Sequence, residues 1–153
     1  MMGKGETLYI TKRVCDLLED KGRGIWFLAP DATVYEAIDQ MAEKGCGALL
    51  VMEGQRLVGI VSERDYARKV ILKGKSSRET EVREIMSHPV FCISPELTVE
   101  QTMAVMTEKH VRHLPVVLED AVVGVISIGD VVRSLLDEKE FYIQQLTAYI
   151  SSA

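Results

Sequence analysis

The chain has 153 residues, of which 47% are hydrophobic and 27% are charged, and its formal net charge at pH 7 is −5. This composition fits a globular protein built as one domain of ~150 residues, or as two half-size units that share a core. The negative charge argues against non-specific nucleic-acid binding, which needs a basic surface. The absence of a visible signal peptide and of an apolar run of about 18 residues predicts a cytoplasmic protein without a membrane span.

The first half begins with a helical stretch at 14–18, which ends at the glycine-rich segment 21–24. We then expect a strand over 25–28 and a helix that starts behind the capping-box pair Thr33 and Glu36. Trp26 in that strand is either a core residue, which we favour, or a stacking surface. Two apolar runs joined by a polar turn predict a hairpin of strands at 48–52 and 57–61, and a helix follows over 63–73. The three cysteines, Cys15, Cys46 and Cys92, form no pairing or metal motif and are expected as reduced thiols in or near the core.

The second half repeats this order after a polar linker at 74–81. The pattern predicts a strand over 90–93, a helix behind the capping-box pair Thr98 and Gln101, a hairpin of strands at 114–118 and 122–126, and a closing helix that opens at 129–136. A helical tail is expected from 137 to 150, with apolar surface from Phe141, Ile143, Leu146 and Ile150.

The two halves are a direct internal repeat with an offset of 65 residues. Between 25–70 and 90–135, 13 of the 46 aligned pairs are identical, among them Ser62 with Ser127 and Asp65 with Asp130. The repeat predicts an α+β fold in which two strand–helix–hairpin–helix units are related by a pseudo-two-fold axis. The expected segments are an N-terminal segment 1–24, a first unit 25–73, a linker 74–81, a second unit 82–136 and a helical tail 137–153.

Each hairpin ends in the same motif, a glycine, two apolar residues, a serine and an aspartate three positions later. It runs from Gly59 to Asp65 and from Gly124 to Asp130. A serine N-cap with an acid at the third helical position stabilises a helix start by itself, so capping alone explains a single copy. The same geometry also suits a nucleotide, since a helix N-terminus attracts an anion and an ionised carboxylate accepts hydrogen bonds from ribose hydroxyls.

The duplicated unit with this motif in both copies resembles a pair of cystathionine-β-synthase (CBS) domains over 14–136. The run from Arg112 to Val116 also resembles the family's usual sequence at the start of the second hairpin. The resemblance implies a tandem CBS fold that binds AMP, ADP, ATP, NAD(H) or S-adenosylmethionine in two clefts between the halves. It further implies a non-catalytic ligand sensor that forms a homodimer and signals to an unidentified effector protein, with no catalytic cofactor, nucleic acid or membrane as a partner.

The resemblance also implies the residues of each site. Asp65 and Asp130 would bind the ribose hydroxyls, and Ser62 and Ser127 would lie beside the ribose and phosphate. Arg64, Arg112 and His113 would face the phosphate. The adenine would lie against backbone near Gly24, Ile25, Gly47 and Ala48 in one cleft, and near Pro89 and Val90 with the Arg112–His113 pair in the other.

The two copies differ where the phosphate would bind. The first has Gly47 and Ala48 at the positions of Arg112 and His113, and the second has Gly129 at the position of Arg64. We therefore expect unequal affinities or two different ligands.

Two other function classes stay open: a nucleotide-processing enzyme with His113 as its base, and a structural interaction module with vestigial clefts. No nucleophile motif accompanies His113, and His110 with His113 lacks a third metal ligand at useful spacing, so neither a catalytic residue nor a metal site is predicted.

Overall fold

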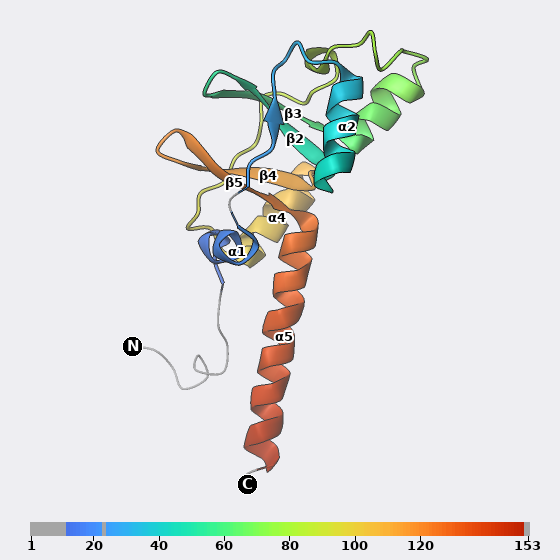
Figure 1. Cartoon of the computed structure of the whole chain (residues 1–153). Helices are drawn as coiled ribbons and strands as arrows, with labels where there is room; N and C mark the ends of the chain where they lie inside the picture. Colours follow the sequence, from blue (N-terminus) through green and yellow to red (C-terminus); the bar gives the residue numbers. More distant parts are fainter. Residues whose placement is uncertain (1–11, 23, 152–153) are drawn as a thin grey trace. The chain divides into compact units, whose positions relative to one another are not determined.

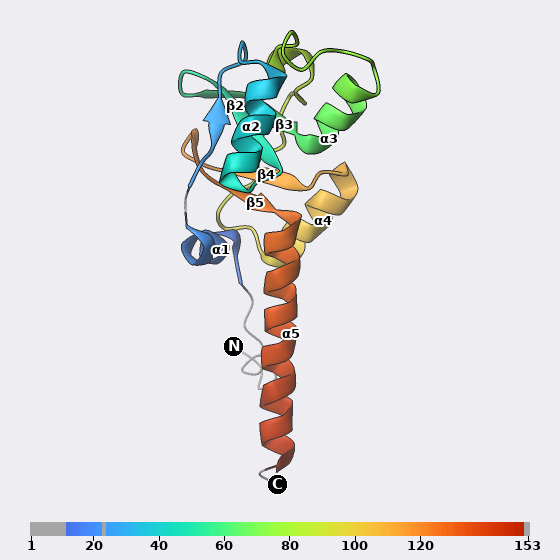
Figure 2. The same cartoon turned by 45° about the vertical axis from the view of Figure 1, so that its right-hand side comes forward.

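The computed structural model describes residues 12–22 and 24–151 (Figures 1 and 2). These residues form two compact units, and each unit has its own hydrophobic core. The first-repeat unit contains Gly24–Cys92 together with Asp120–Val122. The second-repeat unit contains the described residues 12–22, 93–119 and 123–151. The segment that precedes the first repeat in the chain is therefore part of the unit built on the second repeat.

The first-repeat unit is a three-stranded sheet with helices. The strand order is β1-β2-β3, with β1 parallel and β3 antiparallel to β2. Its elements are β1 (Phe27–Leu28), α2 (Val34–Lys44), β2 (Ala48–Glu53), β3 (Arg56–Ser62), α3 (Glu63–Tyr66), the π-helical turn η2 (Ala67–Ile71) and the 3₁₀ turn η3 (Val82–Glu84). The helix expected over 63–73 is thus an α-helical turn that widens into a π-helix.

The second-repeat unit has the same plan with a smaller sheet and a longer last helix. Its elements are α1 (Val14–Lys21), α4 (Val99–Lys109), β4 (His113–Leu118), β5 (Ala121–Ser127, whose first two residues group with the other unit) and α5 (Ile128–Ser151). The closing helix and the helical tail expected from the sequence are one continuous helix of 24 residues. No described helix is long and apolar enough to cross a membrane.

The strand predicted at 90–93 is wrong, because only Ile93 pairs with β4, through a single parallel bridge to Val116. The reason is the residue of the hairpin that faces this segment. In the first repeat, the amide of Leu50 donates to the Trp26 carbonyl at 3.2 Å and extends β1. Leu50 is replaced by Pro115 in the second repeat, and proline has no N–H to donate.

The predicted capping boxes are present at both central helices. Thr33 accepts from the amide of Glu36 at 3.1 Å, and Thr98 accepts from the amide of Gln101 at 3.1 Å. Both helices end at a left-handed residue, Gly45 in the first repeat and His110 in the second. The repeat thus preserves this backbone even where histidine replaces the glycine that the left-handed region favours.

The glycine of the hairpin motif makes room for a neighbouring segment. A Cβ at Gly124 would collide with the side chain of Leu18 on α1, and one at Gly59 would collide with Met86. Met86 belongs to the stretch that precedes the second repeat, yet it packs in the first-repeat unit, where Ser87 pairs with Ile60. In each unit, therefore, the last strand of the hairpin packs against the segment that precedes the other repeat.

Two expectations about burial are wrong. Trp26 is exposed, because it lies just before the two-residue β1, and the Lys44 ammonium lies 4.6 Å from its ring centroid. Cys92 is also exposed, in the stretch where the predicted strand does not form, while Cys15 and Cys46 are half-buried. Cys15 and Cys92 are free thiols.

Candidate functional site

Both Ser/Asp pairs form the predicted capped helix starts. In the first repeat, Asp65 Oδ2 accepts from the Ser62 amide at 2.9 Å and from its hydroxyl at 3.1 Å, and the Asp65 amide donates to Ser62 Oγ at 3.2 Å. In the second repeat, Asp130 Oδ2 accepts from the Ser127 amide at 2.8 Å, and the Asp130 amide donates to Ser127 Oγ at 3.2 Å. Each aspartate is thereby fixed in one orientation at the junction of strand and helix.

The residue before each hairpin lies at the same place. The carbonyl of Gly47 accepts from the Glu63 amide at 3.1 Å, and the carbonyl of Arg112 accepts from the Ile128 amide at 2.8 Å. Ala48 pairs with Ser62 across β2 and β3. The predicted residues Gly47, Ala48 and Arg112 are thus next to the capped helix starts of their own units.

A lysine from the same helix contacts Asp65 in the first-repeat unit. Lys69 Nζ lies 3.2 Å from Asp65 Oδ1 and donates to the carbonyl of Ile85 at 2.9 Å. The Asp65 side chain is only 14% exposed, whereas its chain neighbour Arg64 is exposed. The site therefore combines a shielded carboxylate with one lysine in contact with it.

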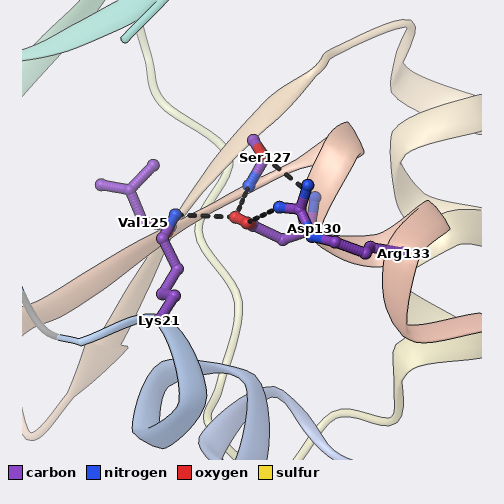
Figure 3. Close-up of polar contacts among 5 residues, drawn as sticks. All are labelled: Lys21, Val125, Ser127, Asp130 and Arg133. Atoms are coloured by element: carbon purple, nitrogen blue, oxygen red, sulfur yellow. Dashed lines mark hydrogen bonds and ion pairs between the residues drawn. The ribbon is translucent and has the colours of Figure 1, made fainter. Parts of the chain in front are cut away.

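The lysine at Asp130 comes from a different element, the last turn of α1 (Figure 3). Lys21 Nζ lies 2.7 Å from Asp130 Oδ2 and 3.0 Å from the carbonyl oxygen of Val125. Arg133 approaches the other carboxylate oxygen, with Nη2 3.1 Å from Oδ1. The Asp130 side chain is 9% exposed, so this carboxylate is shielded from water and engaged by two cations.

Opposing effects act on the pKa of Asp130. Burial, the largest influence, raises the pKa, but the hydrogen bonds from Lys21 and Ser127 and the positive charge of Lys21 together bring it below its ordinary value. Asp130 is consequently ionised at neutral pH and can only accept hydrogen bonds.

His113, at the start of β4, is half-buried near the same charges. Burial lowers its pKa most, the positive charges of Lys21 and Arg112 lower it further, and Asp130 opposes them. His113 is therefore a neutral imidazole at neutral pH. Lys21 and Arg112 are the cationic side chains whose charges act on His113.

The remaining predicted residues all belong to the first-repeat unit. Gly24 is exposed and Ile25 half-buried, just before β1, while Pro89 is exposed and Val90 half-buried. Because Pro89 and Val90 belong to the other unit, their predicted place beside Arg112 and His113 stays a prediction. Within the described part of the chain, no three His, Cys, Asp or Glu side chains are grouped as a metal site would require.

Sequence reasoning missed Lys21, Lys69 and Arg133. Lys69 and Arg133 stand four and three residues after their aspartates, at helical spacing for an ion pair, so a local signal existed. Lys21 gave no such signal, since 109 residues separate it from Asp130.

Comparison with known proteins identifies the class to which this arrangement belongs. The family model of the CBS domain matches residues 22–71 and 82–137. A CBS-domain protein from Burkholderia ambifaria has a solved structure with a TM-score of 0.80 and 46% identity, covering 83% of this chain and 96% of that one. The fold is accordingly an α+β tandem CBS fold.

The chain belongs to the CBS-domain family. Its sequence is 38% identical to the mitochondrial CBS domain-containing protein CBSX3 of Arabidopsis thaliana, over 95% of this chain and 75% of the relative. A more distant CBS domain pair, with 22% identity and a TM-score of 0.73, shares the fold over 82% of this chain and 97% of its own. That pair was solved in complex with 5′-methylthioadenosine and S-adenosyl-L-methionine.

Proposed function

We propose that the chain is a non-catalytic regulatory module that binds adenine nucleotides at the helix starts of α3 and α5. The observation that carries the proposal is the pair of shielded, pre-oriented carboxylates, Asp65 and Asp130, at equivalent positions of the two repeats. An ionised carboxylate that can only accept hydrogen bonds suits the two adjacent hydroxyls of a ribose. Helix capping by itself explains an acid at these positions, but it does not explain the cationic side chains near the acid.

The ligand class follows from the family and from the local charge. CBS domain pairs are generally regulatory modules that bind nucleotides. Both ligands of the distant pair, 5′-methylthioadenosine and S-adenosyl-L-methionine, contain adenosine and therefore a ribose with free hydroxyls. In this chain the cations around each carboxylate favour an added phosphate. AMP is our first choice, with ADP, ATP and NAD(H) as further candidates.

The two sites differ in how they would contact phosphate. Arg64 and Lys69 are the cations of the first-repeat site, and both come from the helix that carries Asp65. The second-repeat site draws on separate elements, with Lys21 from α1, Arg112 before β4 and Arg133 from α5. We propose that their affinities are unequal and that the second site is the tighter one for a phosphate-bearing ligand.

Ligand binding would act by shifting a conformational equilibrium. Asp130 Oδ2 already accepts from Lys21 and Ser127, so a ribose hydroxyl competes with Lys21 for that oxygen. A ligand changes the equilibrium between conformations only by its differential affinity for them. We propose that displacement of Lys21 supplies that difference, and that a homodimer and an effector protein transmit the signal.

The test is a thermal-shift screen with AMP, ADP, ATP, NAD, NADH and S-adenosylmethionine, followed by calorimetry on each ligand that stabilises the chain. Ligand at 100 times its Kd should stabilise the folded state by about 2.7 kcal/mol. Asp65→Asn and Asp130→Asn should each weaken one of two binding events by roughly 10- to 100-fold, because each variant loses a charged hydrogen-bond acceptor.

Asp137→Asn, an exposed carboxylate on α5, is the matched control and should leave both events unchanged. Full affinity in the Asp65→Asn, Asp130→Asn double variant would refute the ribose assignment. Consumption of the nucleotide during long incubation would instead favour an enzyme, and no stabilisation by any ligand would favour a purely structural module.

A further inference from the structure

Helix α5 has a buried face that packs on its own unit and a separate apolar face that is exposed. Val131, Ser134 and Glu138 are buried at helical spacing, and Glu138 Oε1 accepts from the amide of Lys12 at 2.9 Å. These three side chains define the face that packs inward. The contact with Lys12 is the last point along the helix at which a described side chain is buried.

The second face is an exposed stripe, which we call the seam. Its six positions follow one another at steps of four, three, four, three and four residues: Val132, Leu136, Lys139, Ile143, Leu146 and Ile150. Leu136, Ile143 and Ile150 are 61%, 52% and 72% exposed. Leu136, Ile143 and Ile150 recur every seven residues, and so do Val132, Lys139 and Leu146. A seven-residue recurrence of two such positions is the heptad pattern of a coiled-coil seam.

The C-terminal half of α5 also extends past the other helices of its own unit, α1 and α4, in both views (Figures 1 and 2). From 139 to 151 every described residue is exposed except Leu146, which is half-buried. A single helix of about 12 residues is marginal in water, since helices in proteins owe most of their stability to packing of an apolar face. The seam is thus well suited to a helical partner.

We propose that the seam pairs with the seam of a second copy of this chain, as a parallel, in-register, two-stranded coiled coil. In heptad notation, Leu136, Ile143 and Ile150 take position a, and Val132, Lys139 and Leu146 take position d. β-branched residues at a combined with leucine at d favour two strands over three or four. Ile143 and Ile150 with Leu146 between them match that rule. The inference does not depend on nucleotide binding.

The charged residues in and beside the seam bear on the same partner, a second copy of this chain. Lys139 is the one polar residue of the seam, at position d, and a polar residue inside a coiled-coil seam costs stability. Glu140 follows it at position e, which flanks d across a parallel interface. In a parallel pair each Lys139 lies opposite Lys139 of the partner subunit, and Glu140 of the partner subunit, at the flanking position, supplies the opposite charge that offsets their repulsion.

Disulfide trapping tests both the surface and the orientation. In the full chain with the exposed thiol removed by Cys92→Ser, Ile143→Cys should give a covalent dimer under mild oxidation, because equal positions face each other in a parallel pair. Gln144→Cys, one residue along on the outer face, should stay monomeric on denaturing gels. Cross-linking of both variants to the same extent, or of neither, overturns the inference.

Sedimentation equilibrium gives the second readout. Ile143→Glu should weaken self-association at least tenfold, whereas Gln144→Glu should leave it unchanged, with the same circular dichroism in the folded baseline. If Ile143→Glu leaves the dimer intact, the copies associate through another surface and the seam inference fails while the proposed homodimer stands. If the unmodified chain is monomeric at all concentrations, the seam inference and the proposed homodimer both fail.

Discussion

Asp65 and Asp130 occupy equivalent positions in the two repeats, but their lysines come from different places. Lys69 is on the same helix as Asp65, whereas Lys21 reaches Asp130 from α1. A local ion pair forms whenever its helix forms. The Lys21 pair exists only while α1 is docked, so it links the ionisation of Asp130 to the position of the N-terminal helix.

This link predicts an acid-dependent stability. The pKa of Asp130 is lower in the folded chain than its ordinary value of 3.8, so its contribution is complete above that value and is lost as the pH falls through the folded pKa. In Lys21→Met the pKa of Asp130 should rise, and the loss of stability below pH ~4 should be smaller. Carboxyl NMR titration and thermal unfolding across the acid range measure both effects.

The control for this experiment is Lys73→Met, which removes an exposed lysine from the first-repeat unit. It should leave the Asp130 titration as it is in the unmodified chain. An unchanged Asp130 pKa in Lys21→Met would mean that Lys21 contributes nothing to the ionisation of this carboxylate.

At the scale of elements, the contact between α1 and β5 depends on a glycine, Gly124, which has no side chain. Gly124 lies against Leu18, which is fully buried, and a Cβ at position 124 would collide with it. This gives the motif glycine a packing role in addition to its place in the repeat. Docking of α1 through Leu18 is also what brings Lys21 to Asp130.

Gly124→Ala should therefore lower the free energy of unfolding by about 1–3 kcal/mol, the usual cost of overpacking. Gly129→Ala is the matched control, since its nearest neighbour, Ser127 Oγ, would lie 3.6 Å from the new Cβ. At that helical position alanine should stabilise the chain by about 0.4–1 kcal/mol. Chemical denaturation of the two variants measures both, and equal effects would show that Leu18 adapts freely.

The repeat predicted most of the elements correctly, since capping boxes, hairpins and helices depend on residues close together in the chain. The exceptions depend on residues that are distant in sequence. Pro115 removes the donor that a strand at 90–93 would need, and the two-residue β1 leaves Trp26 exposed. Of the candidate site, the Ser–Asp pairs were predictable, but the approach of Lys21 was not.

For the whole molecule, stability should depend on protein concentration. If α5 pairs with a second copy, association stabilises the folded state by mass action, and Tm rises with concentration. A chain that ends at Lys139 lacks the exposed half of α5, so its Tm should be independent of concentration. Calorimetry over a 100-fold range of concentration tests this, and a parallel rise in both chains would assign the association to the remainder of the protein.

The sequence by itself determined the duplicated α+β plan, the capped helix starts and the position of both carboxylates, because each depends on spacing within a few residues or on the 65-residue repeat. Only the tertiary structure decided which segment completes each unit and which lysine contacts each aspartate. Those outcomes follow from packing, since Gly59 and Gly124 admit side chains from segments that precede the other repeat. No local pattern encodes such contacts, and they make two nearly equivalent sites chemically different.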